Sequence, residues 1–265
     1  MIGGSLARGQ SRIIVTSLLD RVRHHARRPI SRTPYVWDAA MLARPEKRKT
    51  LVRPDTALLI EGFLRSGNTY SVAAFRVANG PGPHVARHLH GAPHVLRAAR
   101  LGIPSLVLVR RPRDAVSSYL LRRPALRPRD ALLEYVDFYR TAWPARHAFL
   151  VAAFDDVTHD FGSVLDQVNE RFGTTFRRYE PTVENEAVVL ALVEDMNREE
   201  CGGELVETHV GRPSAERDAR RRELDRLFHA PGTASALESA DEWYRRYLAL
   251  RATPSVGGAQ PSGSR

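Results

Sequence analysis

The segment GFLRSGNTY, residues 62–70, directly follows a short apolar run. Its two glycines, Gly62 and Gly67, have the spacing of the Walker A phosphate loop, and Thr69 stands where that motif carries serine or threonine. The lysine of the motif is replaced by Asn68. A loop of this kind between a strand and a helix predicts an anion site made of backbone N–H groups, with contacts that differ from those of an ATP loop.

Short apolar runs alternate with amphipathic helical patterns along the middle of the chain. Runs that are apolar on both faces are typical of buried parallel strands, which we expect at 57–63, 85–90, 104–110 and 147–154. We expect helices between them at 68–80, 92–101, 113–122 and 128–146, and a helical C-terminal part at 160–172, 184–199, 213–229 and 237–251. The sequence therefore predicts an α/β fold of three layers, α/β/α, with a central parallel sheet as in P-loop NTPases. Ligands of such folds bind at the carboxyl ends of the strands.

Composition divides the chain into three parts. Residues 1–50 are basic and broken by prolines, and we expect a short helix followed by an irregular approach to the core. Residues 51–252 carry the α/β pattern and are expected to form one domain. Residues 253–265 are rich in Pro, Gly and Ser and are expected to be disordered.

Charge and cysteine content limit the class of protein. The net charge of +10 favours polyanionic ligands, although a solvated surface with an arginine bias explains it equally well. Cys201 is the single cysteine, which excludes an internal disulfide and fits a reducing compartment. No run reaches the roughly 20 apolar residues of a membrane span, so we expect a cytoplasmic protein without a transmembrane segment.

A second group of polar residues lies in LVLVRRPRDAVSSYL, residues 106–120. The buried strand ends at Arg110, Pro112 suits the first position of a helix, and Ser118 lies on that helix. Arg110 is therefore expected to face the same crevice as the loop at 62–70. The alternative is that the arginines here pair with surface carboxylates, as most arginines do.

The two segments together resemble the PAPS-dependent sulfotransferases, where PAPS is 3′-phosphoadenosine 5′-phosphosulfate. GFLRSGNTY resembles the 5′-phosphosulfate loop of that family, P-K/R-S-G-T/N-T-W, and VRRPRDAVSSY resembles its 3′-phosphate motif, R-N/D-P-x-D-x-x-x-S. The segment 149–176 is similar to a later family segment, Y-E-D-L followed by F-L-G. The resemblance covers about residues 57–176.

The resemblance implies a role for each matching residue. Arg65 would bind the 5′-phosphosulfate and help catalysis, within a cradle formed by Ser66, Gly67, Asn68 and Thr69. Arg110 and Ser118 would hold the 3′-phosphate, and Tyr70 and Phe154 would stack on adenine, although a buried core position suits Phe154 equally well. The C-terminal loop that closes on the 3′-phosphate in the family has no clear counterpart, and the nearest candidate is Arg212.

A general base for sulfuryl transfer is expected among the histidines of HVARHLHGAPH, residues 84–94. The family's catalytic histidine ends a short strand before the 3′-phosphate arginine, and His88 matches that position best. Alternation along a strand sends His88 and His90 to the same face, so the pattern alone does not choose between them. His84 and His94 are better explained as structural histidines.

The implied activity is in-line transfer of a sulfuryl group from PAPS to a hydroxyl of a carbohydrate or small-molecule acceptor, leaving PAP. No metal and no nucleic acid are called for, and homo-oligomerisation stays open. Two other functions compete with this one. A P-loop kinase or nucleotidase is suggested by Asp155 and Asp156, which follow a strand as Walker B carboxylates do, and a noncatalytic polyanion or nucleic-acid binder by the arginines of 217–227.

Overall fold

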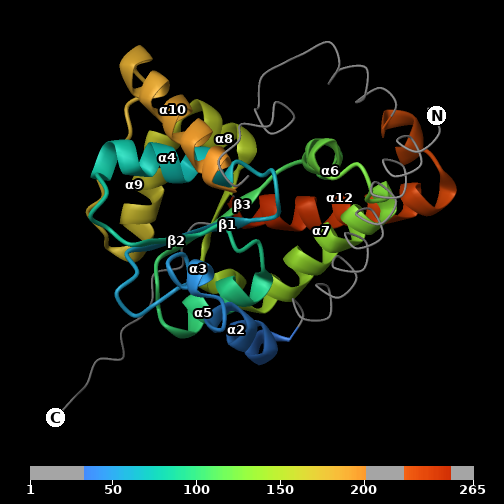
Figure 1. Cartoon of the computed structure of the whole chain (residues 1–265), viewed down its shortest axis with the longest axis horizontal. Coiled ribbons are helices and arrows are strands. Elements are labelled where there is room, and N and C mark those ends of the chain that lie inside the picture. Colours follow the sequence, from blue (N-terminus) through green and yellow to red (C-terminus); the bar gives the residue numbers. More distant parts are fainter. Residues whose placement is uncertain (1–32, 201–223, 252–265) are drawn as a thin grey trace, which may run out of the picture.

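A four-stranded parallel sheet forms the centre of the described part of the chain. The computed structural model describes residues 33–200 and 224–251. Within them the strand order is β2–β1–β3–β4 (Figure 1). The strands are β1 (Leu58–Gly62), β2 (Val85–Arg87), β3 (Ser105–Val109) and β4 (Leu150–Ala153). Each neighbouring pair is parallel, which confirms the predicted parallel sheet.

Helices cover both faces of the sheet. Successive side chains of β1 alternate between two hydrophobic clusters, because Leu59 joins one cluster whereas Leu58 and Ile60 join the other. The second cluster includes residues of α4 (Asn68–Asn79), α8 (Phe154–His159), α9 (Phe161–Phe172) and α10 (Val183–Glu200). The first includes residues of α5 (Ala92–Arg100), α6 (Pro112–Arg122), α7 (Pro128–Ala142) and α12 (Pro231–Arg251). Helices α4, α9 and α10 lie on one side of the sheet and α5 and α7 on the other (Figure 1), so the three-layer prediction is confirmed.

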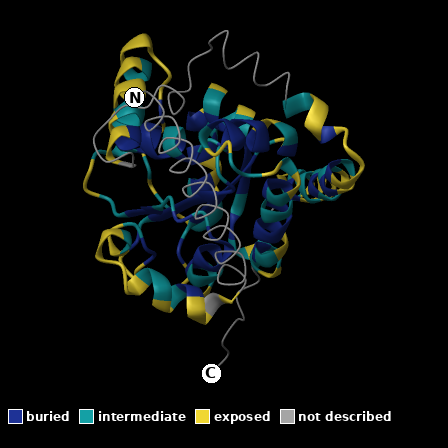
Figure 2. Ribbon diagram, turned by 45° about the vertical axis from the view of Figure 1, so that its right-hand side comes forward, coloured by how far each residue is buried: buried dark blue, intermediate teal, exposed yellow. Residues whose placement is uncertain are grey.

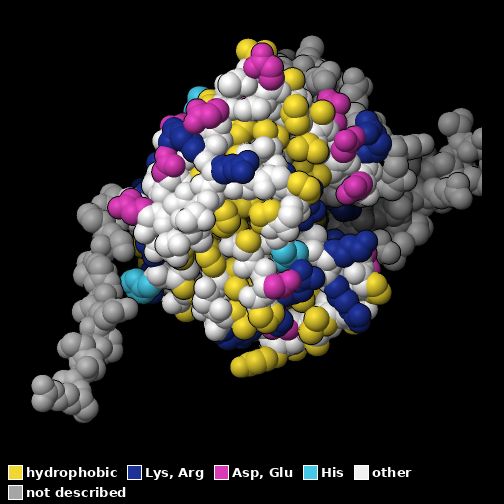
Figure 3. Space-filling model, turned by 90° about the vertical axis from the view of Figure 1, so that its left-hand side faces the viewer, with side chains coloured by type: hydrophobic (Ala, Val, Ile, Leu, Met, Phe, Trp, Pro, Cys, Tyr) yellow, Lys and Arg dark blue, Asp and Glu magenta, His cyan; other side chains and the backbone are white. Residues whose placement is uncertain are grey.

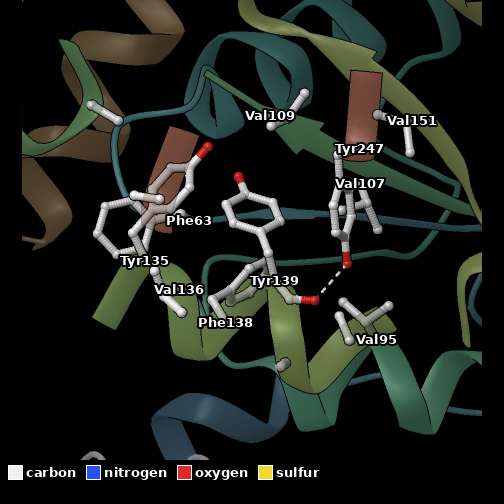
Figure 4. Close-up of a cluster of buried hydrophobic side chains, with 14 of the residues drawn as sticks. Phe63, Val95, Val107, Val109, Tyr135, Val136, Phe138, Tyr139, Val151 and Tyr247 are labelled. Atoms are coloured by element: carbon white, nitrogen blue, oxygen red, sulfur yellow. Dashed lines mark hydrogen bonds between the residues drawn. The ribbon is translucent and has the colours of Figure 1, made fainter. Parts of the chain in front are cut away.

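Buried tyrosines fix α7 and α12 to the sheet. Figure 2 shows the strands buried beneath the helices. The Tyr139 hydroxyl donates to the carbonyl oxygen of Leu108 on β3 at 2.8 Å, and the Tyr247 hydroxyl donates to the Tyr139 carbonyl at 2.9 Å (Figure 4). A buried phenol without a partner would cost free energy, so these bonds let large aromatic rings fill the core. Phe63 packs edge-on against Tyr135 in the same cluster, which anchors the start of the 63–67 loop.

Two short helices precede the sheet in the chain. They are α2 (Pro34–Leu42) and α3 (Pro45–Arg48), and each begins with a proline, where the missing N–H costs nothing. Trp37 of α2 is buried in a small cluster with Leu51 and Leu89. A short helix was expected in this region, and the two prolines start helices here instead of interrupting them.

The structure corrects several predicted boundaries, among them the start of α12, which was expected at 237 and lies at Pro231. The strand expected at 85–90 ends at Arg87, because the backbone then turns into the left-handed region. The helix expected at 128–146 ends at Ala142 and continues as a 3₁₀ helix, η1 (Trp143–Ala148), because Pro144 has no N–H to extend an α-helix. The strand expected at 147–154 begins only at Leu150, because η1 runs to Ala148, and it ends at Ala153, since Phe154 begins α8.

Other expectations fall on residues that the structure does not describe. They concern residues 1–32, Cys201, most of the helix at 213–229, and the tail from 253. Among the described helices, none combines the length and the apolar character that a membrane span requires.

Candidate active site

Four predicted site segments meet at one edge of the sheet. The strands are parallel, so their carboxyl ends lie together. His88 follows β2, Arg65 lies in the loop after β1, Arg110 follows β3 and Phe154 follows β4. Because the sheet order is β2–β1–β3–β4, these residues follow one another across the edge in the order histidine, loop, arginine, aromatic ring.

The loop between β1 and α4 is tightly packed and requires glycine at one position. Gly67 has a φ of 95°, and a Cβ there would lie 3.0 Å from Val157 Cγ2 and 3.3 Å from a ring carbon of Phe154. Asn68, at the position of the Walker lysine, is buried and its side-chain amide donates to the Phe63 carbonyl at 3.1 Å. Asn68 therefore braces the loop, and its side chain does not reach out as the lysine of an ATP loop does.

The start of α4 carries backbone N–H groups of the kind that an anion site requires. Asn68, Thr69 and Tyr70 are the first three residues of α4, and no side chain among the described residues caps the helix. Their N–H groups have no acceptor within the helix, and the positive end of the helix dipole favours an anion there. The Ser66 N–H donates to the Phe63 carbonyl at 3.3 Å, and the Ser66 side chain is fully buried.

Residues from both predicted motifs contact one another directly. Arg65 Nε donates to Ser118 Oγ at 2.9 Å, and Arg110 Nη1 donates to the Arg65 carbonyl at 2.9 Å. The Arg110 guanidinium lies over the Phe154 ring, 3.8 Å from its centroid. The Tyr135 hydroxyl donates to the Arg110 carbonyl at 2.8 Å and fixes its backbone. Two guanidinium groups and a serine hydroxyl thus converge beside the N-terminal end of α4.

Tyr70 contacts α10. Its hydroxyl donates to Glu186 Oε1 at 2.6 Å, and the Tyr179 hydroxyl donates to the same oxygen at 2.7 Å. Burial raises the pKa of Tyr70, and the bond to Glu186 raises it further. Tyr70 therefore joins α4 to α10. Arg212, the remaining predicted binding residue, lies outside the described residues.

His88 and His90 lie side by side, with ring centroids 5.9 Å apart. The Nε2 atom of His88 is buried and has no hydrogen-bond partner in the described structure. Burial, followed by the charge of His90, lowers the pKa of His88 to about 3. The His90 Nδ1 atom lies 3.1 Å from the Gly62 carbonyl oxygen, and its side chain is 17% exposed.

Glu61 is a site residue that the sequence reasoning missed. It lies on β1 and is fully buried, and it accepts hydrogen bonds from the backbone N–H of Leu89 at 2.8 Å and of His90 at 3.2 Å. Burial alone would raise its pKa, but the bond from His94 and the charge of His90 outweigh it, and the pKa is lowered. The sequence did contain a signal for Glu61, because it is a glutamate within an otherwise apolar strand. A buried carboxylate needs polar partners, so such a residue points to a polar site nearby.

The other two histidines of the 84–94 segment have structural bonds at both ring nitrogens. His94 Nε2 accepts from the Val52 N–H at 2.9 Å, so its proton lies on Nδ1 and is donated to Glu61 at 3.0 Å. His84 contacts Thr56 Oγ1 at 3.0 Å and the Lys49 carbonyl oxygen at 3.1 Å. The geometry agrees with a structural role for both.

The aspartates that suggested a kinase have a different role in the structure. Asp156 Oδ2 accepts from the Ala153 N–H at 2.8 Å at the start of α8, and its Oδ1 pairs with Arg251 of α12 at 2.7 Å. Asp155 is exposed. Asp156 is thus a helix-capping residue, which removes the Walker B argument for an ATP enzyme.

Among the described residues, no group of three or more His, Cys, Asp or Glu side chains could hold a metal ion. Figure 3 shows one face of the molecule, on which acidic and basic side chains are mixed among hydrophobic ones. This face has no single-sign patch of the kind that binds a polyanion.

Comparisons with known proteins add little. The chain matches no protein-family model, and no curated protein matches it at a significant level. Among solved structures, mouse sulfotransferase SULT7A1 complexed with PAP is similar with a TM-score of 0.35 and 12% sequence identity, over 71% of this chain and 90% of that chain. Similarity of this size carries no argument about function, so the site stands on its own geometry.

Proposed function

We propose that the protein is a sulfotransferase that uses PAPS as the donor and a hydroxyl compound as the acceptor. The observation that carries the proposal is the direct contact between the two motifs: Arg65 bonds to Ser118, and Arg110 bonds to the Arg65 carbonyl. A donor with a 5′-phosphosulfate and a 3′-phosphate needs two adjacent anion sites, one at the loop and one beside it. Arg65 and the α4 N–H groups suit the first, and Arg110 with Ser118 suits the second.

The residues around the loop after β1 suit PAPS better than they suit ATP. Gly67 packs against Val157 and Phe154, which leaves the Arg65 side chain and the first N–H groups of α4 as the groups that we propose contact the donor. Asn68 is engaged with Phe63, and Asp156 caps α8, so the lysine and the carboxylate of an ATP site both lack a counterpart here. These two observations favour PAPS over ATP.

The proposed chemistry assigns a task to each group. Arg65 and the helix N–H groups stabilise the charge on the sulfuryl oxygens and on the departing phosphate. A histidine of the His88–His90 pair takes the acceptor proton, and the motif position points to His88. Phe154, held under the Arg110 guanidinium, offers a ring face for the adenine. PAPS supplies the sulfuryl group and leaves as PAP.

The acceptor is proposed only by class. Carbohydrate and small-metabolite hydroxyls both suit a neutral imidazole base, and the proposal requires neither a metal nor a nucleic acid.

Replacing Arg110 tests the proposal. Arg110→Ala should weaken PAP binding by about 2–5 kcal/mol if the guanidinium is a desolvated partner of the 3′-phosphate. AMP, which lacks that phosphate, should bind nearly as it does to the wild type. Isothermal titration calorimetry in the presence of EDTA measures both affinities.

Arg111→Ala is the matched control, because it removes the same charge from an adjacent, exposed position. It should change PAP affinity by about 0.5 kcal/mol or less. Equal losses in the two variants would mean that PAP responds only to net charge, and the 3′-phosphate site would be wrong.

A further inference from the structure

The ring of His90 is held in one defined tautomer. Its Nδ1 atom lies 3.1 Å from the Gly62 carbonyl oxygen. A carbonyl oxygen only accepts hydrogen bonds, so Nδ1 carries the proton. In a neutral ring the lone pair then lies on Nε2, which has no hydrogen-bond partner among the described residues. A histidine with one nitrogen anchored and the other left basic has the arrangement of a general base.

Glu61 holds the backbone of this histidine in place. Its two carboxylate oxygens accept from the His90 N–H at 3.2 and 3.3 Å, and one of them accepts from the Leu89 N–H at 2.8 Å. These bonds keep His90 at a φ of 47°, a left-handed conformation that a histidine adopts only when its surroundings require it. The Nδ1 atom of His94 also donates to Glu61 Oε1, at 3.0 Å.

The same carboxylate lies close to the His90 ring. Glu61 Oε2 is 3.9 Å from His90 Nδ1, within the range of a favourable charge interaction if the ring takes up a proton. Glu61 is fully buried, so water screens this interaction little. Glu61 thus fixes the backbone of His90 and lies close to its ring.

In the described structure, no hydrogen bond joins His88 to Glu61 and none anchors its ring as the Gly62 carbonyl anchors that of His90. The Nε2 atom of His88 is buried without a partner, and no carboxylate in the described structure bonds to its ring. Burial disfavours the charged form that a base must adopt during the reaction.

We propose that His90 presents the basic nitrogen of the active site and that Glu61 is its positioning residue. This inference rests on the proposed function, because a proton acceptor is needed only if a hydroxyl is being activated. It differs from the motif-based assignment to His88, and it adds a residue that the sulfotransferase-like motifs do not contain.

Two measurements on the full chain test the inference. Nitrogen-15 NMR with labelled histidine identifies the tautomer of each ring, and diethyl pyrocarbonate, followed by mass spectrometry, measures the reactivity of each basic nitrogen. We expect His90 to be protonated at Nδ1 and to react several-fold faster than His88. Glu61→Gln should mix the two His90 tautomers and reduce that reactivity, while PAP affinity stays near the wild-type value because the donor is held by other residues.

Glu186→Gln is the matched control, because Glu186 is a partly buried carboxylate that accepts two side-chain bonds and has no hydrogen bond or ion pair with His90 in the described structure. It should leave the His90 tautomer unchanged. A His90 ring protonated at Nε2 in the wild type, or a His88 ring that reacts faster, would overturn the inference even if Glu61→Gln does not fold. If the wild type binds PAP and fails either test, only this inference is lost; if it binds no PAP, the proposed function is lost first.

Discussion

Arg65, His88 and His90 share an uncommon backbone conformation. They are the non-glycine residues with positive φ in the described part of the chain, at 67°, 57° and 47°. A residue held in a sparsely populated region costs about 1–3 kcal/mol and persists only where the surrounding structure requires it. The bond from its N–H to Glu61 holds His90 in this conformation. Arg65 is held by the bond that its carbonyl accepts from Arg110 and by the bond that its side chain donates to Ser118. The strain lies entirely at the edge of the sheet where we place the active site.

His88 should make the stability of the protein depend on pH. Its pKa is about 3 in the folded state, and the ordinary histidine value is 6.5. The unfolded chain therefore binds a proton that the folded chain refuses between these values, and stability falls as the pH drops below about 6.5. From pH 7 to pH 5 the loss attributable to His88 should be about 2 kcal/mol.

Urea unfolding of wild type and His88→Asn at both pH values measures this loss. The variant should lose less stability on acidification, whereas His159→Asn, which changes an exposed histidine, should behave like the wild type. An identical pH dependence in His88→Asn and wild type would show that His88 is not held neutral by burial.

At the residue level, the sequence predicted which residues lie together where a motif carries its own spacing, and their binding roles stay predictions. Arg65, Arg110 and Ser118 were selected because their intervals match two motifs of the sulfotransferase-like pattern, and they contact one another in the structure. Glu61 was missed because its partners, Leu89 and His90, belong to a distant part of the chain. The hydrogen bonds from Leu89 and His90 to Glu61 also distinguish His90 from His88, whereas strand alternation places both histidines on the same face.

Helix α8 links the active-site edge to the C-terminal helix. It begins at Phe154, under the Arg110 guanidinium, and Asp156 accepts the Ala153 N–H and pairs with Arg251. Asp156→Ala should lower the free energy of unfolding by about 1–2 kcal/mol, the usual cost of a lost helix cap. Chemical denaturation measures the change.

Arg251→Ala separates the cap from the ion pair. The pair is partly exposed, so its loss should cost about 0–1 kcal/mol. If Asp156→Ala costs no more than Arg251→Ala, the capping bond contributes nothing measurable, and the assignment of Asp156 as a cap is contradicted.

Most element boundaries were predicted to within three residues because strand and helix periodicities differ clearly, but α12 begins at Pro231, well before the expected start at 237. Helix α8 was missed, since the apolar run before it continues into Phe154 and hides the helix start. The early end of β2 was also missed, because left-handed turns at non-glycine residues leave no mark in hydrophobic patterning.

At the scale of the whole molecule, the strand order arranges the chemistry. With β1 between β2 and β3, the loop that contains Arg65 lies between the histidines and Arg110. A donor bound along this edge would have its sulfuryl group toward the histidines and its 3′-phosphate toward Arg110. The parallel sheet was predictable, but the strand order, and with it this arrangement, came only from the structure.

The central claim, that this edge binds a nucleotide through its 3′-phosphate, is tested most directly by comparing PAP with AMP on the wild-type protein. Isothermal titration calorimetry with EDTA present removes any contribution from Mg²⁺. The account predicts that PAP binds tighter than AMP by at least about 2 kcal/mol, the lower bound for a desolvated charge contact. Equal affinities for PAP and AMP would contradict it.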